Sequence, residues 1–222
     1  MPAVENFRKT IKRAEAMISL HKTLCPRGKP KVEYSDILRA AVVISVAAMD
    51  GYFHERIPES LAPFVRAKKG KNLPGRLLQI VKDSVCHDRL IEILFEERPL
   101  SHLVTIVRKA TADRTYQDAG KIEQAVGMLG VDDLWFKVGQ KLKLSKEKAK
   151  NYVQSYVGRR HQIVHRGDYG QTKRSKNQVK PMGRAYAQRC VREVGRFVEA
   201  IDEVIEAAVA ELEKKRCPTS AD

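Results

Sequence analysis

The sequence contains few cysteines. Its 222 residues include only Cys25, Cys86, Cys190 and Cys217, which are widely separated and form no C-x-x-C pair. This spacing excludes both a dense disulfide framework and a recognisable thiolate metal site. We therefore predict free thiols in a reducing cytoplasm, and we expect neither a metal nor another cofactor.

Long hydrophobic segments are also missing. The longest apolar run, from Ile37 to Met49, contains Arg39 and is shorter than the roughly 20 residues that a membrane-spanning helix needs. The N-terminus has no apolar segment followed by a small-residue cleavage site, so no secretion signal is visible. The sequence predicts a cytoplasmic protein.

Acidic residues are scarce relative to basic ones. The 27 Asp and Glu residues against 42 Lys and Arg residues give a net charge of +15, while 43% hydrophobic residues indicate a globular chain. Such a charge favours a polyanionic partner, either nucleic acid or an anionic membrane surface. Aromatic residues make up only 6% of the chain. No amphipathic face rich in Trp and Phe supports the membrane alternative.

No segment shows the sustained period-2 alternation of a β-strand, whereas helical periodicity is widespread. We predict an all-α fold, a single-domain up-and-down helical bundle over residues 1–216 with a flexible tail over 217–222. The expected helices cover about residues 4–24, 35–56, 75–96, 99–111, 115–128, 132–142, 145–166 and 184–215. The second is expected to end before Pro58, and Ser145 and Gly167 to bound the seventh.

The segments between these helices are basic. We expect a basic connector over residues 66–82 and a mobile basic loop over residues 169–183. The last helix is the longest, and its apolar residues recur every three or four positions, as in a packed bundle or a dimer seam. These residues are Cys190, Val194, Phe197, Ile201, Val204, Ala208 and Leu212.

Most of the positive charge lies in one segment. Between Lys137 and Arg184 there are 14 Lys and Arg residues against only Glu147 and Asp168, a net charge of +12. A solvated lysine-rich helix face is the simpler explanation, but the run extends over a helix, a loop and the next helix start. We interpret it as an RNA-binding basic face. Its candidate residues are Lys146, Lys150, Arg166, Lys173, Arg174 and Lys176.

Arg160 occupies an unexpected position within this segment. At about 100° per residue, it projects along the middle of an apolar stripe formed by Ala149, Val153, Tyr156, Val157, Ile163 and Val164. An unpaired buried charge is costly, so Arg160 must meet a carboxylate, a partner chain or a bound anion. His161 and His165 are four residues apart and therefore lie on one side of the helix.

An arginine beside histidines suits phosphodiester chemistry. The guanidinium can stabilise charge on phosphoryl oxygens, and an imidazole can act as general acid or base. The 2′-hydroxyl of RNA supplies a nucleophile without a metal. Three alternatives remain: Arg160 pairs with a buried carboxylate such as Asp50, His161 and His165 bind zinc, or the site binds phosphate without catalysis.

The run from Arg160 to His165 matches the R-x4-6-H motif of HEPN domains, including a polar residue directly after the arginine. The segment Ala47-Ala48-Met49-Asp50-Gly51-Tyr52-Phe53-His54-Glu55 and the continuation His165-Arg166-Gly167 resemble the RiboL-PSP-associated HEPN subgroup. The resemblance covers about residues 35–56 and 145–210.

This resemblance implies a dimeric all-α bundle in which two motifs face one cleft. Many members are metal-independent endoribonucleases of toxin–antitoxin or antiviral defence systems, and their products carry a 2′,3′-cyclic phosphate. Arg160 and His165 would be catalytic and His161 supporting. Weaker supporting candidates are Arg159, Asp50, His54 and Glu55. The implied partners are RNA, a second copy of the chain and an acidic antitoxin protein. The alternative function is a non-catalytic RNA- or nucleotide-binding HEPN module.

Overall fold

The computed structural model describes residues 2–26, 32–170 and 178–216, which form an all-α fold. Within these ranges the only β feature is an isolated bridge between Tyr169 and Val179. The prediction of an all-α bundle is confirmed. The ten helices of the described residues are α1 (Ala3–Leu24), α2 (Val32–Ala67), α3 (Gly75–Ser84), α4 (His87–Leu94), α5 (Pro99–Thr111), α6 (Ala119–Gly127), α7 (Leu134–Leu142), α8 (Lys146–Lys150), α9 (Gln154–Arg166) and α10 (Arg184–Arg216).

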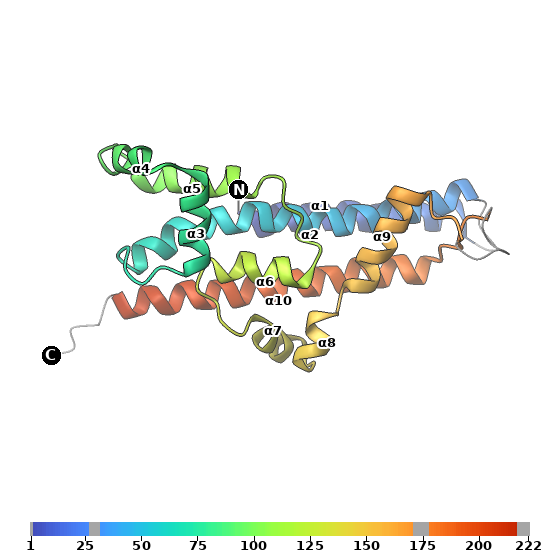
Figure 1. Cartoon of the computed structure of the whole chain (residues 1–222). Helices are drawn as coiled ribbons and strands as arrows, with labels where there is room; N and C mark the ends of the chain where they lie inside the picture. The colour runs from blue at the N-terminus through green and yellow to red at the C-terminus, as the bar shows by residue number, and fades with distance from the viewer. Residues whose placement is uncertain (1, 27–31, 171–177, 217–222) are drawn as a thin grey trace.

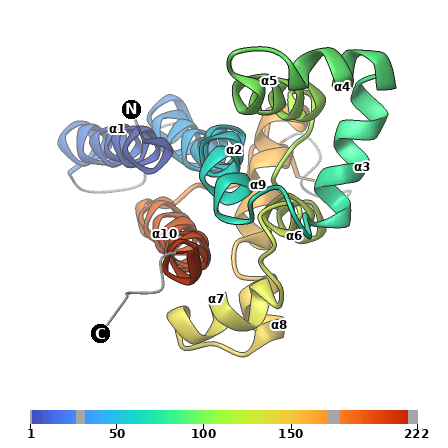
Figure 2. The ribbon, with the colours of Figure 1, turned by 90° about the vertical axis from the view of Figure 1, so that its left-hand side faces the viewer.

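Three long helices, α1, α2 and α10, lie side by side and form the centre of the molecule (Figures 1 and 2). The rings of Phe7, Tyr52 and Phe53 meet edge to face between α1 and α2. The Tyr52 hydroxyl donates to Asp202 on α10 over 2.7 Å, and Arg56 pairs with the same carboxylate at 2.9 Å. The long helices are thus joined by both apolar packing and a polar network.

The prediction that the second helix ends before Pro58 is wrong, because α2 continues through Pro58 and Pro63 to Ala67. A proline inside a helix costs about 3 kcal/mol. Here the cost of the two prolines is opposed by the fully buried side chains of Leu61 and Phe64, each worth roughly 1.5–3 kcal/mol. The predicted connector over residues 66–82 is accordingly reduced to residues 68–74.

Helix α2 is also apolar and long enough to cross a membrane by composition, as judged over the described residues. Of its most apolar window, 56% is buried inside the bundle. Its apolar character therefore matches its place between α1 and α10.

Two of the predicted middle helices differ from the structure. The helix expected over residues 75–96 is divided into α3 and α4 by extended backbone at Val85 and Cys86. The helix expected from residue 115 begins at Ala119, because the Asp118 side chain caps it by accepting from the amides of Gly120 and Lys121.

The continuous helix predicted over residues 145–166 is also wrong. Ser145 caps α8 and Gly167 ends α9 as expected, but a turn at residues 151–153 separates the two helices, which point in different directions in Figure 1. The apolar stripe projected from residues of α8 onto Arg160 therefore does not exist as one face.

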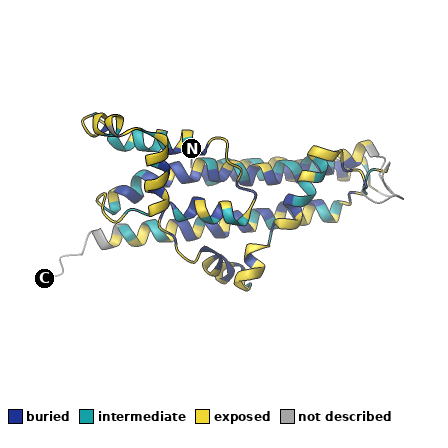
Figure 3. Cartoon of the chain, in the orientation of Figure 1, coloured by how far each residue is buried: buried dark blue, intermediate teal, exposed yellow. Residues whose placement is uncertain are grey.

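Helix α10 is confirmed in position and pattern. Its first five predicted apolar positions, Cys190, Val194, Phe197, Ile201 and Val204, are buried, and Ala208 and Leu212 pack against the core at its edge. Figure 3 shows this buried face turned toward the other long helices. The stripe is thus used for packing within the chain.

Candidate active site on helix α9

Helix α9 carries the Arg160 and His165 motif. Its buried residues Tyr156 and Val157 face the core, and its last turn ends at Gly167, which adopts φ 58°. The amides of Gly167 and of the next residue, Asp168, both reach back to the carbonyl of Gln162, the latter over 3.1 Å. The exposed side of the helix therefore ends in a fixed turn.

The two histidines form a stacked pair on the exposed side of α9. The ring centroids of His161 and His165 are 5.6 Å apart with an interplanar angle of 21°. Together with Gln162 and Arg166 they line a surface pocket of about 350 Å³. Partial desolvation, followed by the charges of Arg160 and His165, lowers the pKa of His161. At neutral pH this imidazole is mainly neutral and can accept a proton.

Arg160 is half-buried on α9 beside His161 and does not itself line this pocket. Its Nε is buried and has no hydrogen-bond partner among the described residues. Among the residues that the structure describes, no carboxylate lies within the 4.0 Å of an ion pair with Arg160. The alternative in which Arg160 pairs with Asp50 is therefore wrong for this chain, because Asp50 instead accepts from the Tyr116 amide and from Gln117.

A buried carboxylate, Asp168, fixes the end of α9. Its side chain is 0% exposed and accepts from Nε of Arg39 on α2 and from a terminal nitrogen of Arg159 on α9, both at 2.8 Å. One carboxylate thus neutralises two arginines from different helices, whose sequence positions are 129 and 9 residues away. The backbone of Asp168 itself adopts φ 62°.

The chain that follows Asp168 is tied into the same cluster. The amide of Lys180 donates to the backbone oxygen of Asp168 at 2.9 Å, and Arg39 donates to the carbonyl of Lys180 at 2.5 Å. The Lys180 ammonium reaches the side chain of Gln162 over 2.7 Å. These contacts hold α9 against α2, so the direction in which Arg160 and His165 project is set by packing.

A family model described as RiboL-PSP-HEPN matches residues 8–207 of the chain. The chain belongs to the RiboL-PSP-HEPN family. The match extends from α1 to α10 and includes both the α2 segment and the α9 motif. Membership supports a nuclease or RNA-related module in general terms. Neither the curated proteins nor the solved structures include a significant match.

The α2 candidates of this HEPN domain lie away from the α9 pocket within one chain. Arg159 shares the Asp168 carboxylate with Arg39 of α2, and Asp50 and Glu55 lie about 17 and 24 Å from Arg39 along the axis of α2 at 1.5 Å per residue. His54 packs its ring against Tyr116 at 4.8 Å.

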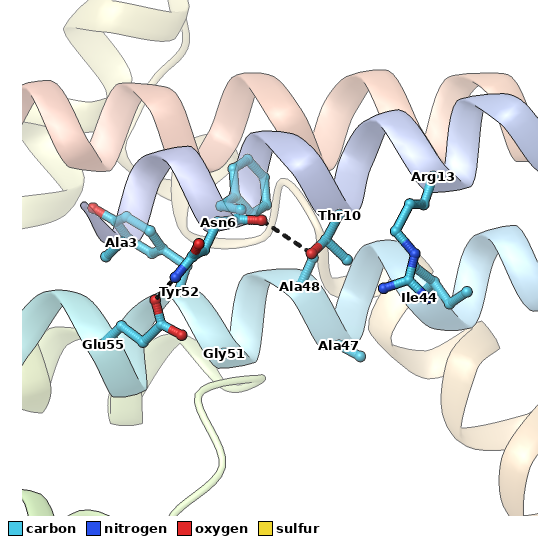
Figure 4. A pocket seen from close by; sticks show the side chains of 11 residues that line it. Ala3, Asn6, Thr10, Arg13, Ile44, Ala47, Ala48, Gly51, Tyr52 and Glu55 are labelled. Carbon is cyan, nitrogen blue, oxygen red and sulfur yellow. Dashed lines mark hydrogen bonds between the residues drawn. The ribbon is translucent and has the colours of Figure 1, made fainter. Parts of the chain in front are cut away.

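Glu55 instead belongs to a groove between α1 and α2 (Figure 4). There it accepts from Asn6 at 2.7 Å, and the exposed residues Ala47 and Gly51 line the floor. Glu55 thus joins α2 to α1, whereas Asp50 and His54 join α2 to the loop between α5 and α6 in the single chain.

The predicted basic face is partly described. Arg166 lines the histidine pocket, Lys150 is exposed, and Lys146 lies 3.7 Å from Asp133. Lys173, Arg174 and Lys176 lie outside the described residues, as do residues 217–222 of the predicted tail. For the zinc alternative, no group of three or more His, Cys, Asp or Glu residues is placed to hold a metal within the described ranges.

Two residues of the site, Asp168 and Arg39, were missed by sequence reasoning although both left a signal. Arg39 is the only charge within the apolar run from Ile37 to Met49, and such a charge needs a partner. Asp168 is one of only two acidic residues in the basic segment and directly follows the helix-ending Gly167. Their separation in sequence concealed that the two side chains form an ion pair.

Proposed function

We propose that this HEPN domain is a metal-independent endoribonuclease that cleaves RNA by attack of the 2′-hydroxyl. The observation that carries the proposal is Arg160. Its buried Nε has no partner, and it adjoins the stacked histidine pair, while Asp168 satisfies its neighbour Arg159 instead. A guanidinium with an unpaired nitrogen beside imidazoles is suited to a phosphodiester.

In the proposed reaction the 2′-oxygen forms a bond to phosphorus and the bond from phosphorus to the 5′-oxygen breaks. A general base removes the 2′ proton, and a general acid protonates the leaving 5′-oxygen, which leaves a 2′,3′-cyclic phosphate. Arg160 stabilises the charge that develops on the non-bridging oxygens. His165 supplies the acid–base function, and His161 supports it by keeping a neutral imidazole against the His165 ring.

We propose a homodimer as the active form. One HEPN domain contributes one His165, whereas a two-fold axis brings a second, so that one copy acts as base and the other as acid. The open pocket at His161 and Arg166 leaves room for an apposed chain. The net charge of +15 further fits a cytoplasmic toxin or defence effector that binds RNA and is restrained by an acidic antitoxin.

The test incubates RNA with purified protein in EDTA. The wild type should cut, and Arg160→Ala and His165→Ala should each reduce the rate by at least 100-fold without changing the circular dichroism spectrum. Matched controls are Arg13→Ala on α1 and His102→Ala on α5, which should cut at the wild-type rate. RNA binding without cleavage by the wild type would contradict the enzyme and favour a non-catalytic RNA-binding module.

A further inference from the structure

Helices α7 and α8 form a short hairpin on the outer side of α10, where both views show it projecting from the long helices (Figures 1 and 2). The turn is tight: Lys143 adopts φ 57°, and a Cβ on Gly139 would lie 2.7 Å from the backbone oxygen of Leu144. Ser145 then caps α8 by accepting from the amide of Lys148. The sequence thus specifies a defined shape for this hairpin.

The hairpin is anchored to the core by its inner face. The Trp135 ring stacks on Phe197 of α10 with centroids 6.2 Å apart, and its indole nitrogen donates to Glu123 over 3.1 Å. Leu134, Val138 and Leu142 are buried on the same side. A surface that is held in this way presents its outer side chains in a fixed arrangement.

The outer face of the hairpin is strongly positive. Residues 134–150 include six lysines, no arginine and one acidic residue, Glu147. Lys141 pairs with Glu203 and Lys146 approaches Asp133. For the other four, Lys137, Lys143, Lys148 and Lys150, no described carboxylate lies within 4.0 Å, and all four are exposed.

An aromatic side chain lies among these lysines. Phe136 is 54% exposed and precedes Lys137 on the outer side of α7. Aromatic rings next to cations are a common platform for unpaired bases.

We propose that the outer face of α7 and α8 is a docking surface for single-stranded RNA, separate from the catalytic pocket. Its lysines contact the phosphate backbone without sequence preference, and Phe136 stacks on a base. This inference rests on the proposed function because it takes RNA as the ligand.

The residue types favour RNA over a protein partner on this face. Protein interfaces are depleted in lysine and enriched in arginine, whereas lysine is the only basic residue type on this face. By contrast, α9 carries Arg159, Arg160 and Arg166, whose planar guanidinium groups can hold a phosphate in a defined orientation. The chain therefore separates a lysine surface that attracts the RNA backbone from an arginine surface that positions it, and only the turn at residues 151–153 lies between α8 and α9.

The experiment measures binding of a fluorescein-labelled single-stranded 12-mer RNA by anisotropy over a salt series. All proteins carry Arg160→Ala to prevent cleavage. The test variant combines Lys137→Gln, Lys143→Gln and Lys148→Gln. The matched control combines Lys12→Gln, Lys22→Gln and Lys82→Gln, which removes the same charge from α1 and α3, and thermal melts verify that both fold.

Loss of three phosphate contacts should lower the salt slope by about 2 and weaken binding on the order of 100-fold at 0.1 M salt. The control should change both much less. Phe136→Ala should weaken binding about tenfold or more, whereas Phe95→Ala, directly after α4, should not. Equal losses in the two triple variants, or no RNA binding at all, would overturn the inference.

These outcomes are separable from the fate of the proposed function. A protein that cuts RNA but shows equal losses in both triple variants refutes only the docking surface. A protein that binds through the hairpin but does not cut RNA refutes only the enzyme.

Discussion

The conformation of the α9 site depends on the buried carboxylate of Asp168, and its removal should be costly. The most informative change is Asp168→Asn, because asparagine tolerates the observed φ of 62° and keeps the shape of the side chain while removing its charge. In this variant Arg39, only 7% exposed, would keep its contacts with Asp36 and with the Lys180 carbonyl. Arg39 and Arg159 would lose the one buried negative charge that they share.

Breaking a buried ion pair by removing one partner costs roughly 3–5 kcal/mol. We expect about 3 kcal/mol for Asp168→Asn, since two weaker contacts to Arg39 survive. For a chain of this length that corresponds to a melting temperature lower by about 6–12 °C. Urea unfolding followed by circular dichroism measures the free energy directly.

The matched control is Asp133→Asn. Asp133 also has a left-handed backbone, with φ 52°, but its side chain is 71% exposed and lies 3.7 Å from its lysine. It should cost less than about 1 kcal/mol. Equal effects of the two substitutions would refute the view that Asp168 is the buried countercharge of the site.

Three further predictions concern individual side chains. His21 is buried and accepts from Arg184, and both burial and that charge lower its pKa. The stability that the neutral His21 contributes is therefore complete above pH 6.5 and is lost as the pH falls below 6.5. Between pH 7 and pH 5, urea unfolding should show a smaller loss of stability for His21→Gln than for the wild type. An equal loss would contradict this. Burial raises the pKa of the Cys190 thiol to about 12. In a Cys217→Ser background, a thiol reagent at pH 8 should therefore label Cys86 and Cys25 in the native protein but Cys190 only in urea. Rapid labelling of Cys190 in the native protein would argue against its burial. Gly139→Ala should destabilise the protein by about 1–3 kcal/mol, because the new Cβ would meet the backbone oxygen of Leu144. Gly158→Ala has open space around its new Cβ and should be neutral or stabilising by up to about 1 kcal/mol. Thermal melts that show the same sign for both would be inconsistent with the hairpin geometry.

The sequence was sufficient for the helices whose boundaries are set locally. Helices α1, α5 and α10 begin and end close to the predicted positions, because apolar periodicity and flanking breakers coincide there. Helix α2 was predicted too short, since the proline rule counts only the lost backbone bond. The burial of residues such as Phe64 against distant helices outweighs that loss.

The site was predicted in part. The two histidines do share one side of α9, and Arg160 does have a buried nitrogen without a partner, as its position suggested. The apolar surroundings of Arg160 differ from those predicted, because the turn between α8 and α9 leaves only α9 residues on the face that contains Arg160. The ion pairs of Asp168 with Arg39 and Arg159 depend on contacts between α2 and α9 that no local pattern encodes.

The central claim is that α9 cleaves RNA through the substrate's own 2′-hydroxyl. The most direct measurement compares, in EDTA, an RNA cut at one mapped position with the same RNA carrying a single 2′-deoxynucleotide on the 5′ side of that bond. We expect cleavage of the first RNA, with a 2′,3′-cyclic phosphate end detected by mass spectrometry, and no cleavage of the second at that bond. Cutting of the 2′-deoxy substrate at the same position would contradict this claim.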